Sequence, residues 1–346
     1  MAVLNEELIR QVFDEMIKNR PKLSKYLIID DDDDDEEDEV DYRILGDLII
    51  RNYPWPIGVE LRRLFSGSMR QLDRLRLDQI FKTIERTMQF ISFIMISQAW
   101  KDRAAGKIEI PDSFKNDFTN RFGVLSLGNY TWIIRALGKI YQEQNVEWFM
   151  PETSDNFDKK FYAALDFWVP ERNEIGHYQI NLTQEDIEKR CVEYEEKLTS
   201  ILRKIAFIVK YKLISVREIK VIKTKNHDPS FHHIIDILNS SDSDFKAKEL
   251  DETKFTESHS VLLMKSIKSI DAYLNLSPLI IDTNSEVLDH KDKFDIKKDI
   301  FMYTKYRSGH IMYIGTEVTE KCDLRSLSNY DILVEQYEDM IKTITN

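Results

Sequence analysis

Residues 167–178 read FWVPERNEIGHY, and they lie between two segments of helical periodicity. The stretch contains an Arg-Asn-x-x-x-His core, formed by Arg172, Asn173 and His177. Pro170 stands directly before this core, and proline suits the first turn of a helix. The sequence therefore predicts that a helix begins at Pro170, with the polar core beside the partial positive charge of its N-terminus.

These residue types suit the cleavage of a phosphodiester without a metal. An imidazole such as that of His177 takes the proton of a ribose 2′-hydroxyl or gives one to a leaving oxygen. The guanidinium of Arg172 holds a phosphate and offsets the charge that builds on its oxygens. The candidate catalytic residues are therefore Arg172, His177 and, between them, the amide of Asn173. Neither a cofactor site nor a metal site is predicted.

Arg172, Asn173 and His177, set between amphipathic helices, resemble the R-N-x-x-x-H signature of HEPN domains. These are all-α ribonucleases common in bacterial toxin–antitoxin, anti-phage and CRISPR-linked systems. Residues 125–137, which read LSLGNYTWIIRAL, are similar to the Leu-Gly-bearing helix that often precedes this motif in the family. The resemblance covers a helical region of residues 60–213.

The resemblance implies a metal-independent endoribonuclease that acts as a homodimer, with two Arg/His pairs meeting across a shared cleft. One imidazole would activate the 2′-hydroxyl and the other would protonate the 5′-oxygen, leaving a 2′,3′-cyclic phosphate. Arg172 would bind the phosphate, and Asn173 would orient His177 or the phosphate. RNA is then the expected substrate, and a partner or activator protein from a defence operon is an expected binding partner.

Other interpretations of the motif stay open. Arg172 could pair with Glu171, Glu174 or Asp166 on a solvated helix end. His177 would then cap or pack locally, and the helical region would act as a non-catalytic scaffold, an antitoxin partner or an RNA-binding adaptor. A regulatory alternative has the C-terminal part sense a phage component or a nucleotide while the helical part responds.

The net charge of the chain limits its non-specific binding to nucleic acid. The net charge is −12, which argues against broad binding driven by the phosphate backbone. Ten of the acidic residues form one block, residues 30–39, which is predicted to be a solvated loop because like charges repel. An alternative is that this block mimics nucleic acid and covers a basic site.

Composition predicts well-packed hydrophobic cores, and the targeting signals that the sequence lacks predict a cytoplasmic protein. The 346 residues are 42% hydrophobic, enough for two domains. The two cysteines, Cys191 and Cys322, show no zinc or disulfide spacing, and Cys191 falls on an apolar helix stripe. The N-terminus lacks the pattern of a signal peptide, and the most apolar stretch, residues 90–100, is too short to cross a bilayer, so no membrane is expected.

Periodicity along the chain predicts an α+β fold. Helical spacing of apolar residues recurs over residues 5–19, 71–100, 112–122, 128–141, 157–168 and 183–208. Thr183 and Asp186 form a capping box at the start of the last of these helices. After residue 213 the pattern becomes strand-like, with a hairpin turn expected at Arg307 and a closing helix over residues 330–344. We therefore expect an N-terminal helix and acidic loop (1–59), an all-α HEPN-like bundle (60–213) and a smaller β-rich domain (214–346).

Within the β-rich part, one hairpin interleaves basic and aromatic side chains: Tyr303, Lys305, Tyr306, Arg307 and His310. Such a pattern suits a nucleic-acid surface, and the alternative is a solvated hairpin with ordinary cross-strand contacts. The histidines at 227, 232 and 233 match no firm metal-binding spacing and are expected in loops and at strand edges.

Overall fold

The computed structural model describes residues 5–27, 41–177, 182–239, 245–283, 299–317, 321–322 and 324–346. Contacts divide the chain into two compact units, each discontinuous in sequence. The first comprises Met1–Arg86, Glu152–Lys210 and Asn239–Ser241, and the second comprises Thr87–Pro151, Tyr211–Leu238 and Asp242–Asn346. Each unit combines parts of more than one of the predicted ranges 1–59, 60–213 and 214–346, which stay predictions.

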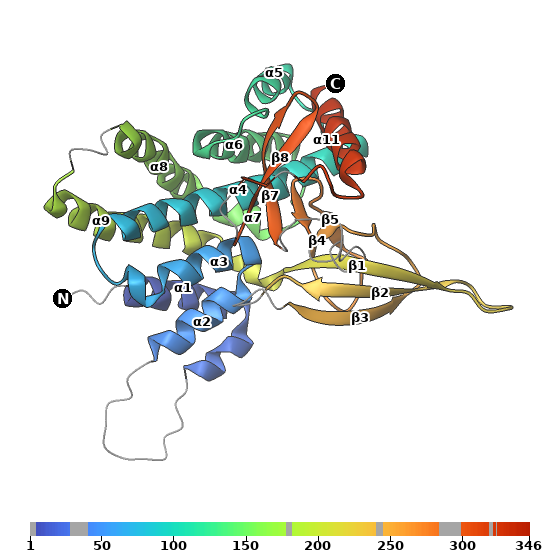
Figure 1. Cartoon of the computed structure of the whole chain (residues 1–346), viewed down its shortest axis with the longest axis horizontal. Coiled ribbons are helices and arrows are strands. Elements are labelled where there is room, and N and C mark those ends of the chain that lie inside the picture. The colour runs from blue at the N-terminus through green and yellow to red at the C-terminus, as the bar shows by residue number, and fades with distance from the viewer. Residues whose placement is uncertain are drawn as a thin grey trace, which may run out of the picture. The chain divides into compact units, whose positions relative to one another are not determined.

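Helices build the described part of the first unit (Figure 1). They are α1 (Glu6–Asn19), α2 (Tyr42–Asn52), α3 (Trp55–Leu64), the first part of α4 (Arg74–Ala104), α7 (Glu152–Asn156), α8 (Lys159–His177) and α9 (Gln184–Lys204), with 3₁₀ turns η1 (Pro21–Tyr26), η2 (Gly67–Met69) and η3 (Ala206–Lys210). The predicted acidic loop at residues 30–39 lies outside the described residues.

The first helix shows how the apolar spacing becomes a core. Leu8, Val12, Phe13 and Met16 recur at steps of three and four, and all four are buried in α1. This face packs against α2, α9 and η3. The helix expected over residues 5–19 is therefore confirmed, and its burial joins the start of the chain to the helix that follows the motif.

A glycine sets the distance between α2 and α3. A Cβ atom built at Gly58 would lie 2.8 Å from the carbonyl oxygen of Ile50, which is fixed backbone. Only glycine therefore lets α3 come this close to the end of α2. Pro54 begins the turn between the two helices with an extended backbone, φ −56° and ψ 143°.

The second unit places the rest of α4 with α5 (Asp112–Arg121), α6 (Leu127–Gln144) and α11 (Tyr330–Thr345). The helices predicted at 112–122, 128–141 and 330–344 are thereby confirmed. An aromatic ladder fills part of its core: Phe118 stacks on Phe122 with centroids 4.5 Å apart, and Phe122 stacks on Tyr303 at 5.2 Å. None of the helices in the described ranges is long and apolar enough to cross a membrane.

Two antiparallel sheets complete the second unit. One has the order β3-β2-β1-β4-β5 and the other β6-β7-β8-β9. The strands are β1 (Lys212–Ile222), β2 (Ser230–Ile237), β3 (Lys246–Glu252), β4 (Val261–Met264), β5 (Tyr273–Asn275), β6 (Ile280–Asp282), β7 (Ile300–Arg307), β8 (His310–Gly315) and β9 (Lys321–Cys322). The α+β fold, with helices in the N-terminal part and sheets from residue 212 onward, is confirmed.

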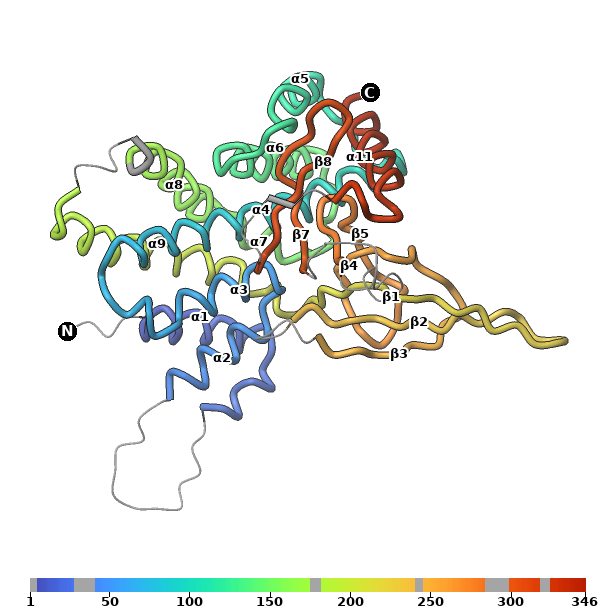
Figure 2. Tube along the Cα trace, in the orientation of Figure 1, coloured from blue at the N-terminus to red at the C-terminus, as the bar shows by residue number. Residues whose placement is uncertain are grey.

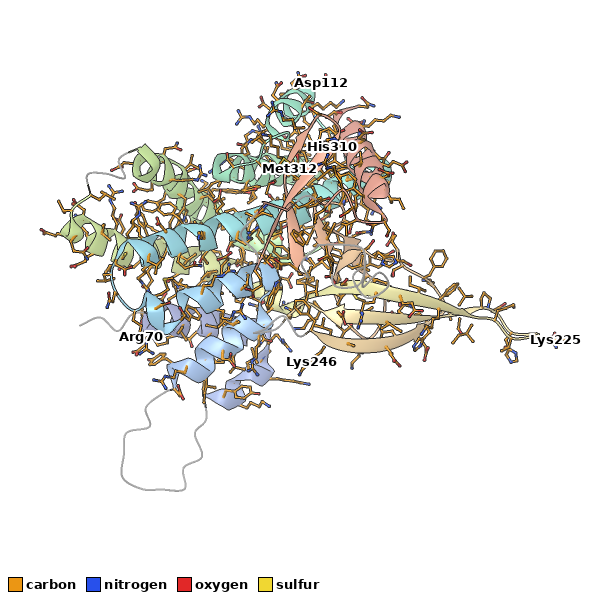
Figure 3. The ribbon with its side chains drawn as sticks, in the orientation of Figure 1. Arg70, Asp112, Lys225, Lys246, His310 and Met312 are labelled. Atoms are coloured by element: carbon orange, nitrogen blue, oxygen red, sulfur yellow. The ribbon has the colours of Figure 1, made fainter. Side chains whose placement is uncertain are left out.

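The two principal hairpins differ in how their turns are made. Ser308 and Gly309 both have positive φ, 53° and 78°, as a two-residue turn between β7 and β8 requires. The hairpin predicted at Arg307 is thus confirmed. The β1–β2 hairpin is longer, and the trace shows it as an extended two-stranded arm (Figure 2). Lys225 lies near its tip (Figure 3).

Candidate functional site

The prediction that a helix begins at Pro170 is wrong. α8 runs without a break from Lys159 to His177 and carries Pro170 in its interior. An interior proline loses one helical hydrogen bond and costs about 3 kcal/mol. Burial of the part of α8 before the proline offsets that cost, because Phe161, Leu165 and Trp168 are all at most 1% exposed. Trp168 also meets the ring of Phe81 edge-on, with centroids 5.7 Å apart.

The motif therefore occupies the last two turns of a helix rather than its first. The C-terminal end of a helix carries a partial negative charge, which favours the cation of Arg172 but would not attract a phosphate by itself. Position 177 lies one turn beyond position 173 on the same side of α8. Positions 172 and 177, five residues apart, are about 140° apart around the axis at 3.6 residues per turn. Positions 172 and 177 therefore lie on different sides of the α8 backbone.

The first two motif residues are exposed on α8. The guanidinium of Arg172 lies 3.6 Å from the carboxylate of Glu85 on α4, and the two side chains are 47% and 39% exposed. Asn173 is also exposed. The side chain of His177, the predicted acid–base residue, lies outside the described residues. The structure therefore places Arg172 and Asn173 together on the exposed side of α8.

An ion-pair network lies one turn away, between α8 and α9. The guanidinium of Arg190 donates to Glu171 at 3.2 Å and also to Glu174. It donates to the hydroxyl of Tyr194 at 3.0 Å, and that hydroxyl donates to Glu171. Burial and the bond to Glu171 raise the pKa of Tyr194. The alternative pairing of Arg172 with Glu171 or Glu174 is not what the structure shows, because Arg190 takes both carboxylates.

The capping box brings Arg190 to this network. The Thr183 hydroxyl accepts a hydrogen bond from the backbone N–H of Asp186 at 3.2 Å, and the Asp186 carboxylate accepts one from the Thr183 N–H at 3.1 Å. Both bonds of the predicted motif are present, so this prediction is confirmed. The start of α9 is thereby fixed, and Arg190 faces α8 two turns into the helix.

Charge at the described part of the site is mixed. Arg172 and Arg190 face three carboxylates, those of Glu85, Glu171 and Glu174. Sequence reasoning missed Glu85 and Arg190 as neighbours of the motif because they come from other helices. The pair that involves Arg172 is exposed and hence weak, whereas Arg190 is held by two glutamates. Arg172 is therefore the cation of this group that is easier to redirect toward an anion.

The basic and aromatic hairpin of the second unit is not the open surface that its sequence suggested. Tyr303 is fully buried, and its hydroxyl donates to the carbonyl of Phe122 at 2.8 Å. Tyr306 donates to Glu338 at 2.6 Å. Both hydroxyls fasten β7 to neighbouring helices. The ring of Tyr303 is unavailable for stacking on bases, whereas Tyr306 is half-buried and Arg307 and His310 are exposed. The exposed turn agrees with the alternative of a solvated hairpin, but Tyr303 and Tyr306 bond to groups outside the hairpin and not only across its strands.

One histidine and one cysteine of the second and first units, His233 and Cys191, are buried. His233 was expected at a strand edge, but it is fully buried in β2: its Nε2 accepts from the N–H of Thr256 at 3.3 Å. Cys191 is buried as expected, and burial raises the pKa of its thiol to about 11. Across the described residues, no three His, Cys, Asp or Glu side chains gather as a metal site would need.

Comparison with known proteins adds no relative. Searches against protein families, curated proteins and solved structures return no match for this chain.

Proposed function

We propose that this chain is a metal-independent endoribonuclease of the HEPN type that works in the cytoplasm, in anti-phage defence or a toxin–antitoxin pair. The observation that carries the proposal is the state of Arg172. Its guanidinium is nearly half exposed, and its ion pair with Glu85, at 3.6 Å, is of the exposed kind that contributes about 0–1 kcal/mol. A phosphate can displace Glu85 at little cost, with exposed Asn173 beside it.

In the proposed reaction one imidazole takes the proton of the ribose 2′-hydroxyl, whose oxygen then attacks the phosphorus. The bond to the 5′-oxygen breaks, a second imidazole protonates that oxygen, and a 2′,3′-cyclic phosphate remains. His177 is the one histidine of the motif, and the helix turns positions 172 and 177 to different sides. A second copy of the chain would therefore supply the partner residues, so the proposal includes a homodimer.

A second candidate is a non-catalytic scaffold that binds RNA or a partner protein. The observation that favours it is the local charge, because Glu85, Glu171 and Glu174 outnumber the two arginines they pair with. In this case the motif contributes structural ion pairs. The two candidates differ in what removal of Glu85 does: a nuclease loses a competitor for Arg172, and a scaffold loses a contact.

The test is cleavage of end-labelled single-stranded RNA by the purified chain, in the presence of EDTA. Removal of an acid–base group costs about 10²–10⁴ in rate, so His177→Ala and Arg172→Ala should each lose at least about a hundredfold. The matched control is Arg74→Ala, since Arg74 is also partly exposed and paired on the surface, with Asp78 at 2.9 Å. That variant should cut like the wild type.

Glu85→Gln separates the two candidates further. If Arg172 binds phosphate, cleavage at low salt should rise, by up to about fivefold for a pair worth at most about 1 kcal/mol. RNA left uncut by the wild type, alone and with the products of neighbouring genes, would leave the scaffold as the answer. Sedimentation tests the dimer separately: a strict monomer with full activity would remove the composite site from the proposal.

A further inference from the structure

A second site lies in the first unit, away from the motif. A cavity of about 630 Å³ opens between α8 and α9, with Glu15 of α1 on its rim. Its polar lining includes Lys160 of α8 and Lys197, Arg203 and Lys204 of α9. Four cations therefore face one carboxylate, which is the opposite balance to that around Arg172.

Two of the four cations are already neutralised. Arg203 donates to Glu15 at 3.0 Å, and Lys204 donates to Asp158 at 2.8 Å. The hydrogen bond from Lys204 lowers the pKa of Asp158. Partial burial would raise the pKa of Glu15, but bonds from Lys18 and Arg203 lower it. Both carboxylates thus stay charged near neutral pH and hold their partners in place.

Lys160 and Lys197 remain available. Across the described residues neither ammonium has a carboxylate within ion-pair distance, and one comes from each wall of the cavity. The ammonium of Lys197 lies 5.4 Å from the centre of the Phe167 ring, a cation–π contact that holds it at the cavity without cancelling its charge. Two unpaired cations on facing walls would bind a group with more than one negative oxygen.

Apart from Asn156 and Ser200, the rest of the lining is apolar. This apolar part consists of Phe161, which is fully buried, and of Ala163, Ala164 and Phe167. The volume falls within the range of about 300–1,000 Å³ that is usual for small-molecule sites and is larger than an inorganic phosphate needs. A ligand that fits must therefore combine a multiply charged anionic group with a flat apolar part.

We propose that this cavity binds a nucleoside di- or triphosphate, with phosphate oxygens bridging Lys160 and Lys197 and the base lying against Ala163, Ala164 and Phe167. This site goes beyond the proposed cleavage of RNA and does not depend on it. Bound there, the nucleotide ties α8, which carries Arg172 at its far end, to α9.

The experiment is calorimetric titration of the full chain with ATP, pyrophosphate and adenosine. ATP should bind, pyrophosphate should bind more weakly because it lacks the base, and adenosine should show no measurable binding. In the proposed complex each lysine makes a charge-assisted contact with phosphate, so Lys160→Gln and Lys197→Gln should each weaken the affinity for ATP at least about tenfold. Higher salt should also weaken the affinity for ATP. Lys189→Gln, which removes an exposed cation of α9 outside the cavity, should leave the affinity unchanged.

Three results would each overturn the proposal. They are the absence of a binding heat with ATP, an unchanged affinity for ATP in the Lys160→Gln/Lys197→Gln double variant, and an affinity for adenosine as high as that for ATP. Binding of a single-stranded RNA through these lysines without binding of ATP would also overturn it and assign the surface to a strand. Repeating the titration in the Arg172→Ala background keeps the two proposals apart, because ATP should bind there whether or not the wild type cuts RNA. Thermal melts confirm that the variants are folded.

Discussion

The buried ion pair between Arg76, at the start of α4, and Glu195 of α9 gives the sharpest test of what stabilises the first unit. The Arg76 side chain is fully buried, and its guanidinium donates to the carbonyl of Met69 at 2.7 Å, to the side chain of Asn5 at 2.9 Å and to Glu195 of α9. The Glu195 carboxylate is 13% exposed and also accepts from the N–H of Asn5 at 3.1 Å. Glu195→Ala would leave a buried cation without its counter-charge.

The magnitude follows from that burial. Removal of one partner of a buried ion pair costs about 3–5 kcal/mol, because the remaining charge is uncompensated. The neutral acceptors on Met69 and Asn5 stay in place, so we expect the lower end, about 3 kcal/mol. In the double variant Arg76→Met/Glu195→Leu no charge is left buried, and most of that loss should be recovered.

The assay is unfolding in guanidinium chloride, followed by tryptophan fluorescence. The control is Asp78→Asn, which breaks the exposed pair between Arg74 and Asp78 on α4 and should cost no more than about 0.5 kcal/mol. If Glu195→Ala costs as little as this control, the buried charge is not what Glu195 stabilises. If the double variant is as unstable as Glu195→Ala, the loss comes from packing and not from an unpaired cation.

Three further outcomes follow from single contacts. Gly58→Ala should destabilise the chain by at least about 1–3 kcal/mol, because its Cβ would lie 2.8 Å from the backbone oxygen of Ile50; an unchanged melting temperature would show that the α2–α3 corner can open. Thr183→Ala removes the capping box of α9 and should lower the free energy of unfolding by about 1 kcal/mol, whereas Thr183→Ser keeps the hydroxyl and should retain most of the wild-type stability. Equal stability of the two variants would contradict the role of the cap. The lowered pKa of Asp158 means that its bond from Lys204 stabilises the fold above the ordinary pKa of about 4 and is lost as pH falls through the folded value. Asp158→Asn should therefore lower stability at neutral pH and leave it unchanged in strong acid, and a loss of the same size at both pH values would refute this.

Sequence alone determined the parts of this protein that depend on local spacing. The apolar steps of α1, the capping box at Thr183, the turn at Ser308 and Gly309, and the change of period after residue 213 each predict an element that the structure contains. These features need only a few neighbouring residues, so a single sequence carries them in full. The α+β class follows from their order.

Tertiary structure decided what the local pattern could not. Proline favours a helix start, yet α8 continues through Pro170, with Phe161 and Trp168 buried in the part before it, and the motif lies at its far end. The pairing of Arg172 with Glu85, and the placing of Lys160 opposite Lys197, join residues from different helices. Such contacts depend on how the helices pack, and helix packing follows from the summed burial of many side chains, which no short stretch of sequence records.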